Sequence, residues 1–341
     1  MNSASPSTTR FSPWHLFWAT VLLTLLWRLR QPLMLFFGAV LMAATLRAMA
    51  DPLARLARLP QRVATALVLA ALVLAGWLCI SLIGDPLSQQ LQALRVELPR
   101  AWAALQQWLA RMPLGHRLLD LAGDLRDGGL PWAGIAGAAT GALHAVGTAV
   151  LIVLTGVYLA FDVRLYRNGL LKLLPPARRE AGTHALDAAG EALTRWVRGQ
   201  AVAMLAIGAA VAIGLSLLGM PMALALGLIA GLLEFVPFVG PIASGLLAVL
   251  VAFVQGPQQA LYVAALFVGL QQVENHLLVP LVQRWAVELP PALALGGVVV
   301  FGALFGPAGV MFGTPLVVVT LVLVQELYVK PMSAGKPLAG P

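Results

Sequence analysis

The chain has 341 residues, of which 60% are hydrophobic and 11% are charged. A soluble domain is nearer half apolar and a quarter charged, and several apolar runs here approach or exceed the length of a membrane span. The composition therefore predicts an all-α polytopic membrane protein with about eight hydrophobic segments. The net charge of +8 lies in short arginine clusters beside these segments, so positive-inside bias explains it without a nucleic-acid partner.

The chain is predicted to enter the membrane soon after it begins. Residues 1–10 are rich in serine and threonine and are expected to form a disordered cytoplasmic N-terminus. Residues 11–83 would hold the N-terminal membrane helices, of which 64–83 is the clearest uninterrupted span. Because Arg55, Arg58 and Arg62 precede that span, we place their linker in the cytoplasm.

The composition changes over residues 84–133, which are predicted to form a small extracytoplasmic amphipathic helical insertion. Leu87, Leu91, Leu94 and Leu98 recur at helical spacing, with polar residues between them. Basic and acidic residues are equal in number here, which fits a segment that is translocated to the far side of the membrane. The insertion would either cap the bundle or act as a gate or docking surface, and we favour the structural role.

The second half of the chain divides by charge and hydropathy. Residues 134–161 are predicted to form a membrane helix, and residues 162–198 a basic cytoplasmic amphipathic segment with seven basic and four acidic residues. Such a segment is attracted to anionic headgroups. Residues 199–329 would form a core with broken helices, and residues 330–341 a cytoplasmic tail.

Two segments of this core are too long for one upright crossing and are interrupted by glycine and proline. In residues 222–254 the interruption contains Glu234, Pro237, Gly240 and Pro241. As one helix this segment would reach about 50 Å, so it is either a kinked crossing or a re-entrant hairpin. Residues 292–328 are broken in the same way around Gly306. A pair of broken segments is typical of transporter cores whose half-helices meet near the midplane.

Polar side chains at the same depth mark the candidate site. Gln271, Glu274 and Asn275 share one helix face, roughly 18 Å along their span, and Glu234 lies about as deep in its own. Together with the Gly306 break they would coordinate a polar substrate or a cation, and a carboxylate would bind a proton when the site is empty. The alternative is that these groups hold helices together and satisfy carbonyls freed by the prolines.

Small residues elsewhere in the core have a structural interpretation. The pairs Gly227/Gly231, Gly302/Gly306 and Gly309/Gly313 have the spacing of close helix crossings, and we expect packing to be the role of all of them except Gly306.

The sequence indicates no enzyme chemistry. Serine, histidine and aspartate are not arranged as a hydrolase triad, and no Walker A motif is present. The single cysteine, Cys79, forms no intrachain disulfide, and cysteine and histidine lack metal-ligand spacing. We therefore predict no catalytic residue, no cofactor and no metal site, and transport that does not use ATP.

Three ordered blocks resemble a known family. They are Glu234 to Pro241, Gln271 to Pro280 (QQVENHLLVP), and Gly306 to Pro315. With the preceding run WVRGQ at 196–200, they are similar to the autoinducer-2 exporter-like (PerM-type permease) family, over nearly the whole chain. The resemblance implies a homo-oligomer in a bacterial-type inner membrane. The distribution of arginines predicts that both termini lie in the cytoplasm. Glu288 and Leu289 depart from the family pattern, which has Gly, Leu and His before the proline.

Three functional hypotheses follow. The first is a secondary exporter of a small polar organic molecule such as a signalling metabolite. The second is a monovalent cation/proton antiporter that uses Glu234 and Glu274. The third, a non-transporting membrane scaffold, ranks last because it needs no acids at mid-membrane depth.

Overall fold

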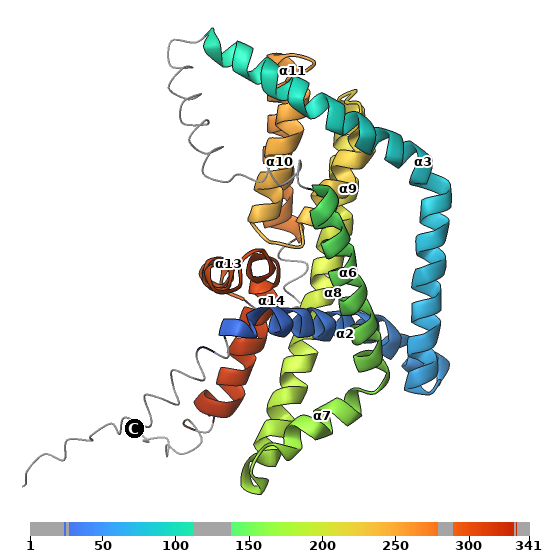
Figure 1. Ribbon diagram of the computed structural model, residues 1–341, viewed down its shortest axis with the longest axis vertical. Helices are drawn as coiled ribbons and strands as arrows, with labels where there is room; N and C mark the ends of the chain where they lie inside the picture. The colour runs from blue at the N-terminus through green and yellow to red at the C-terminus, as the bar shows by residue number, and fades with distance from the viewer. Residues whose placement is uncertain (1–23, 25–26, 112–137, 279–288, 331, 333–341) are drawn as a thin grey trace, which may run out of the picture.

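The chain forms helices and connecting turns throughout the part that can be described. The computed structural model describes residue 24, residues 27–111, 138–278 and 289–330, and residue 332, and within these ranges it has no β-strand (Figure 1). The predicted N-terminal segment 1–10, the tail beyond residue 332 and the end of the predicted insertion lie outside the described residues.

Apolar helices of spanning length confirm the predicted all-α polytopic membrane protein. Among the described residues, four helical stretches are long and apolar enough to cross a bilayer, and a fifth is added if the bent pair α6–α7 counts as one span. The stretches are α2 (Arg30–Ala57), α3 (Gln61–Ala110), α8 (Arg179–Leu217) with the short helix η1 (Pro176–Arg178), and α14 (Pro307–Val324) with the π-helix η3 (Gln325–Val329).

The remaining helices are shorter or bent. They are α6 (Ala138–Phe161), α7 (Val163–Lys172), α9 (Ala223–Leu233), α10 (Val239–Ala252), α11 (Pro257–Val273), the π-helix η2 (Glu274–Leu278) and α13 (Pro291–Phe305). Three of them, α9, α10 and α13, are apolar yet have only 11, 14 and 15 residues. At about 1.5 Å per residue, none of the three crosses a ~30 Å hydrocarbon core alone.

Two segment boundaries predicted at residues 84 and 199 fall inside continuous helices. The helix α3 runs unbroken over 50 residues, with Pro86 and Pro99 inside it, and it bends from the side of the bundle across the end of α9, α10 and α11 (Figure 1). The helix α8 likewise runs unbroken over 39 residues. Both changes of composition therefore occur within continuous helices.

The helices α8 and α9 form an antiparallel hairpin built on glycine. A Cβ atom on Gly231 would lie 2.7 Å from the Met204 carbonyl oxygen, and one on Gly227 would lie 2.5 Å from the Ala212 Cβ. The two backbones therefore touch, as the Gly227/Gly231 spacing predicted. At the far end of the hairpin, Gln259 Nε2 donates to the Leu218 carbonyl oxygen at 2.7 Å, a group that the end of α8 leaves without a helical partner.

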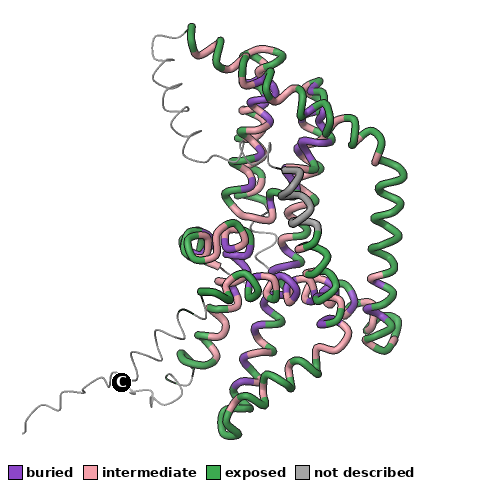
Figure 2. Tube along the Cα trace, in the orientation of Figure 1, coloured by how far each residue is buried: buried purple, intermediate pink, exposed green. Residues whose placement is uncertain are grey.

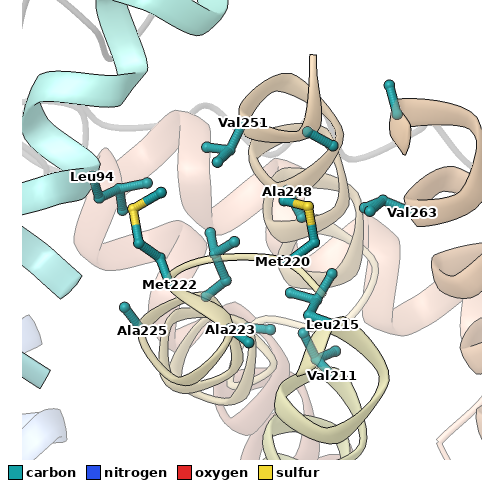
Figure 3. Close-up of a cluster of buried hydrophobic side chains, with 14 of the residues drawn as sticks. Leu94, Val211, Leu215, Met220, Met222, Ala223, Ala225, Ala248, Val251 and Val263 are labelled. Atoms are coloured by element: carbon teal, nitrogen blue, oxygen red, sulfur yellow. The ribbon is translucent and has the colours of Figure 1, made fainter. Parts of the chain in front are cut away.

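The segment formed by α9 and α10 enters and leaves at the same end of the molecule. Ala223 at the start of α9 and Ala252 at the end of α10 belong to one buried cluster, with Leu94 of α3 packed against it (Figure 3). The Ala225 N–H, free at the start of α9, donates to Gln90 Oε1 of α3 at 3.0 Å. This is the geometry of a re-entrant hairpin, one of the two arrangements that the sequence left open.

The helices α13 and α14 form a second hairpin around Gly306. A Cβ on Gly313 would approach Val298 Cα at 2.9 Å, and a Cβ on Gly309 would lie 1.8 Å from the Phe301 carbonyl oxygen. These paired positions move apart symmetrically from the turn, so the helices run antiparallel. Gly302, Gly309 and Gly313 thus serve close packing, whereas a Cβ on Gly306 would meet nothing within 4 Å, and Gly306, with φ +67°, makes the turn itself.

Candidate substrate and ion site

The break between α9 and α10 is the least regular part of the core. Glu234 ends α9, where its N–H still donates to the Ala230 carbonyl oxygen at 2.9 Å. Four residues later Phe238 begins α10 with φ +67° and ψ −44°, outside the usual regions for a bulky residue. Strained backbone of this kind persists only where its surroundings impose it, and it is concentrated at functional sites.

The Glu234 carboxyl group is buried within this break. Its side chain belongs to a residue that is only 3% exposed, and Oε2 has no hydrogen-bond partner among the described residues. The neighbouring carboxyl group is that of Glu274, which is close enough for an electrostatic interaction with Glu234. Gln271 Nε2 donates to Glu274 Oε2 at 3.0 Å. The structure therefore brings together three of the predicted site residues, Glu234, Gln271 and Glu274.

Gln200 of α8 supports the break from the opposite side. Its Nε2 donates to the Glu234 backbone carbonyl oxygen at 2.6 Å, a group for which the interrupted helix provides no i+4 N–H donor. The amide thus fixes the residue that carries the buried carboxyl. The sequence analysis did not assign Gln200 to the site, although the WVRGQ run that ends at Gln200 was one of the family signals.

Aromatic side chains join the two breaks of the core. The Phe235 ring meets Trp196 of α8 edge-on, with centroids 5.8 Å apart, and Phe312 of α14 at 6.5 Å. Phe312 also meets Phe37 of α2 at 6.0 Å. Edge-to-face contacts at these separations are favourable. Because Phe235 follows Glu234 directly, the position of the carboxyl group depends on three packed helices.

Gly240 and the two prolines shape the break. A Cβ on Gly240 would lie 2.0 Å from the Leu233 carbonyl oxygen, so only glycine fits where the start of α10 closes on the end of α9. The Pro237 carbonyl oxygen accepts the Val239 N–H at 2.8 Å. Ser244 Oγ, one helical turn after Gly240, donates to the Gly240 carbonyl oxygen at 2.8 Å. The described contacts of Gly240 and Pro237 are structural.

Asn275 does not join the buried acids. The backbone changes from α-helix to the π-helix η2 at Glu274, which widens the turn just where Gln271, Glu274 and Asn275 were predicted to share a face. Glu274 stays half-buried and Asn275 is exposed. A π-turn is a local insertion that recurs at functional sites. Here Glu274 keeps its contact with Gln271, while Asn275 is exposed.

Gly306 lies in the second break, and its connection to the acids is indirect. It ends α13 with its N–H donating to the Gly302 carbonyl oxygen at 2.8 Å, and it caps the start of α14. Ala308 and Phe312, in the first turns of α14, pack in the same cluster as Phe235. The two breaks are therefore neighbours through Phe235.

The site is rich in oxygen, and its two carboxyl groups can carry negative charge. Within the described residues, no group of three or more histidine, cysteine, aspartate or glutamate side chains is placed to hold a metal ion. Two carboxyl groups and one amide instead suit a proton, a monovalent cation or a hydrogen-bond donor on a solute. An anion would meet the carboxyl groups and be repelled.

Comparison with known proteins gives a consistent assignment. A Mycobacterium tuberculosis protein named as a transport protein is 29% identical over 270 residues, which cover 76% of this chain and 73% of that protein. The Bacillus subtilis protein YueF, also named as a transport protein, is 28% identical over 49% of this chain and 46% of its own length. The Escherichia coli protein PerM, named as a permease, is 28% identical over 49% of this chain and 48% of its own.

The family assignment rests on a longer match. The profile of the AI-2E family transporters matches residues 16–329, which include α2 to α14, both breaks and the two buried acids. The protein is therefore a multi-pass membrane transporter, and this chain belongs to the AI-2E transporter family.

Proposed function

We propose that the chain is a secondary transporter that exports a small polar organic molecule, and that Glu234 and Glu274 bind the coupling proton or monovalent cation. The observation that carries the proposal is the Glu234 carboxyl group, 3% exposed, with Oε2 unpartnered among the described residues and a second carboxyl group as its neighbour. A buried charge without a partner is costly. A bound cation or proton removes that cost, and its release restores it.

The surrounding helices support a site whose occupancy affects conformation. Glu234 lies between two half-helices, and its backbone is fixed by Gln200 while Phe235 is held by aromatic packing. A change of charge on the carboxyl group therefore acts on the junction of α8, α9, α10 and α14. Re-entrant half-helices that meet at an ion site are the arrangement used by many secondary transporters.

A second candidate function is monovalent cation/proton antiport. The same acid pair favours it, because two carboxyl groups that share one site can exchange a proton for a cation without an organic solute. Under either function, we infer inner-membrane location, cytoplasmic termini and assembly as a homo-oligomer, in line with the family resemblance. Pro241 and Gly306, in the two breaks, would then shape the solute path, and the exposed Asn275 would lie farther along it than the acids.

The test is flux in proteoliposomes that contain the purified protein. Small polar metabolites and monovalent cations are screened with and without a pH gradient, and the Glu234→Gln and Glu274→Gln variants are compared with Glu191→Gln, an exposed glutamate on α8. We expect Glu234→Gln to assemble normally, because a neutral amide is cheaper to bury than a charge, and to lose gradient-driven flux.

Further variants distinguish coupling from helix packing. Glu234→Ala should lose gradient-driven flux and, unlike Glu234→Gln, should also assemble poorly, because it removes the side chain that fills the break. If Glu234 is only structural, Glu234→Gln will keep wild-type flux and wild-type gradient dependence, and the coupling role will be wrong. Cation flux without any solute flux would replace the export function by antiport.

A further inference from the structure

The short helix α7 has three faces of different chemistry. One face packs on α8 and comprises Val163, Arg167 and Leu171, all half-buried. Arg167 Nη2 forms an ion pair with Asp187 Oδ2 of α8 at 2.5 Å. Leu171 lies against Gly182 of α8, where an added Cβ would come within 3.4 Å of its Cδ2. These contacts fix the rotation of α7 and decide which residues point away from the bundle.

A second face of α7 is apolar and exposed. Leu165, Tyr166 and Leu170 are 68%, 42% and 52% exposed, and Leu173 at the end of the helix is 81% exposed. Their spacing of one, four and three residues places them on one side of the helix. No residue of α7 is buried. A contiguous apolar surface of this kind, with polar residues beside it, marks an interaction site.

The third face is basic. Arg164, Asn168 and Lys172 follow each other at four-residue spacing, and Arg178 and Arg179 come shortly after the helix ends. Within the described residues, none of these four cations forms an ion pair. The cations of this face therefore have no ion-pair partner among the described residues, and the face lies directly beside the apolar face.

The location of α7 indicates what covers these faces. The apolar helix α6 ends at Phe161, and after one residue the chain turns by 85° into α7. Figure 1 shows α7 leaving the lower end of α6 and crossing to the start of α8. Arg62, at the start of α3, pairs with Asp162 and holds this corner. A helix at right angles to a spanning helix, at its end, runs along the membrane surface.

We propose that α7 is an interfacial helix that docks on the anionic lipids of the cytoplasmic leaflet. Leu165, Tyr166, Leu170 and Leu173 enter the boundary between headgroups and acyl chains. Arg164 and Lys172 bind lipid phosphate groups at the flank, and Arg178 and Arg179 add to the attraction. The combination of an apolar face and a basic face is the one by which helices bind such surfaces.

Charge favours lipid over a second copy of the chain as the occupant. Two copies that met through α7 would bring two basic faces together, with no acidic surface on the same helix to oppose them. Anionic headgroups provide the missing negative charge without a special partner. The bilayer is also already present at this end, because α6 leads out of it.

The test uses the full-length chain in nanodiscs of phosphatidylcholine, with or without phosphatidylglycerol. In a Cys79→Ser background, a fluorophore is attached after Leu170→Cys on the apolar face or after Asn168→Cys on the basic face as the matched control. We expect brominated acyl chains to quench the label at position 170 and not at 168. Quenching at both positions equally, or at neither, would contradict the proposal.

A label-free measurement on the unmodified α7 checks the lipid charge. Hydrogen exchange of the amides of 163–173 should slow in nanodiscs that contain phosphatidylglycerol. Each of Arg164→Gln and Lys172→Gln should weaken this anionic-lipid effect roughly fivefold. Equal exchange in neutral and anionic nanodiscs would overturn the lipid assignment. A disulfide between two Leu170→Cys chains in the membrane would show that a second copy covers the face instead.

Discussion

At the scale of single residues, side-chain amides bond the backbone groups that helix ends and breaks leave without a helical partner. Gln200, Gln90 and Gln259 each bond a carbonyl oxygen or N–H at the end of another helix. In a bilayer, an unsatisfied backbone group costs several kcal/mol. Glutamine is therefore used here to stabilise irregular backbone, and Gln200 does so at the residue that carries the buried acid.

Gln200→Leu should lower the free energy of unfolding by about 1–3 kcal/mol, because it leaves the Glu234 carbonyl oxygen buried without a donor. Denaturation in a mixed detergent series measures the change. Gln258→Leu is the matched control, since that exposed amide bonds only the Tyr262 hydroxyl. If both variants lose stability equally, the Gln200 bond has no special role in the break.

Gly240→Ala should be the most damaging single-methyl change in the break. The new Cβ would lie 2.0 Å from the Leu233 carbonyl oxygen, so the half-helices must separate, at a cost of about 3 kcal/mol or more. Gly269→Ala on α11 is the control, because a Cβ there meets nothing within 4 Å. Thermal unfolding in detergent compares them, and a Gly240→Ala protein as stable as the Gly269→Ala protein would refute the steric argument.

The sequence predicted the acids and not the groups that position them. Glu234, Gln271 and Glu274 stand out because polar residues in apolar runs are rare. Gln200 could not be assigned, because its partner is a carbonyl oxygen 34 residues away in the sequence. Proline and glycine indicate which carbonyl oxygen lacks a helical donor, but not which side chain will bond it. Asn275 is exposed while Glu274 is half-buried, because the i+4 rule assumes an α-helix and η2 changes the turn at Glu274; its role in the site stays a prediction.

At the scale of elements, prolines inside helices create acceptors that other helices fill. Pro52 of α2 has no N–H, so the Ala48 carbonyl oxygen lacks its usual i+4 donor. Arg198 of α8 donates to that oxygen with Nε at 3.1 Å and with Nη2 at 2.7 Å. Arg198 and Gln200, two residues apart on α8, therefore bond the open carbonyl oxygen of α2 and the break after α9, respectively.

This pairing predicts a positive coupling between Arg198 and Pro52. Arg198→Leu should cost about 1–2 kcal/mol in the wild-type background, because the Ala48 carbonyl oxygen loses its donor. In a Pro52→Ala background the residue-52 N–H restores a helical donor, so the same change should cost much less. A double-mutant cycle on unfolding free energies measures the coupling, and a value near zero would exclude this role of Arg198.

The long helices show that a change of composition need not coincide with the end of a helix. The polar change at residue 84 and the end of the basic segment at 198 were read as boundaries, yet α3 and α8 continue through both. Prolines 86 and 99 bend α3 without ending it. The paired broken segments were found correctly, because glycine and proline inside a long apolar run change the backbone itself.

At the scale of the whole molecule, one end is amphipathic and the other is basic. The second half of α3 lies across the ends of α9, α10 and α11, where the Trp108 and Phe253 rings meet at 5.5 Å (Figure 1). At the opposite end, α7, η1 and the start of α8 carry Arg164, Arg178 and Arg179, which form no ion pair with any described residue. Most residues in the first half of α3 are exposed (Figure 2), and many of them are large and apolar, as a lipid-facing span requires.

This arrangement predicts the topology of the chain in the membrane. The re-entrant α9–α10 hairpin returns to the end covered by α3, so Gln258 and Gln106 should face the same, extracytoplasmic side, and Arg179 the cytoplasm. Single cysteines at these exposed positions, in a Cys79→Ser background, are labelled in intact cells by a membrane-impermeant maleimide. Position 258 is chosen for the label because a cysteine at the neighbouring Gly256, with φ +119°, would be strained. We expect labelling at 258 and 106 in intact cells and at 179 only after permeabilisation. Labelling of 106 but not of 258 in intact cells would mean that α9 and α10 cross the membrane as one kinked span.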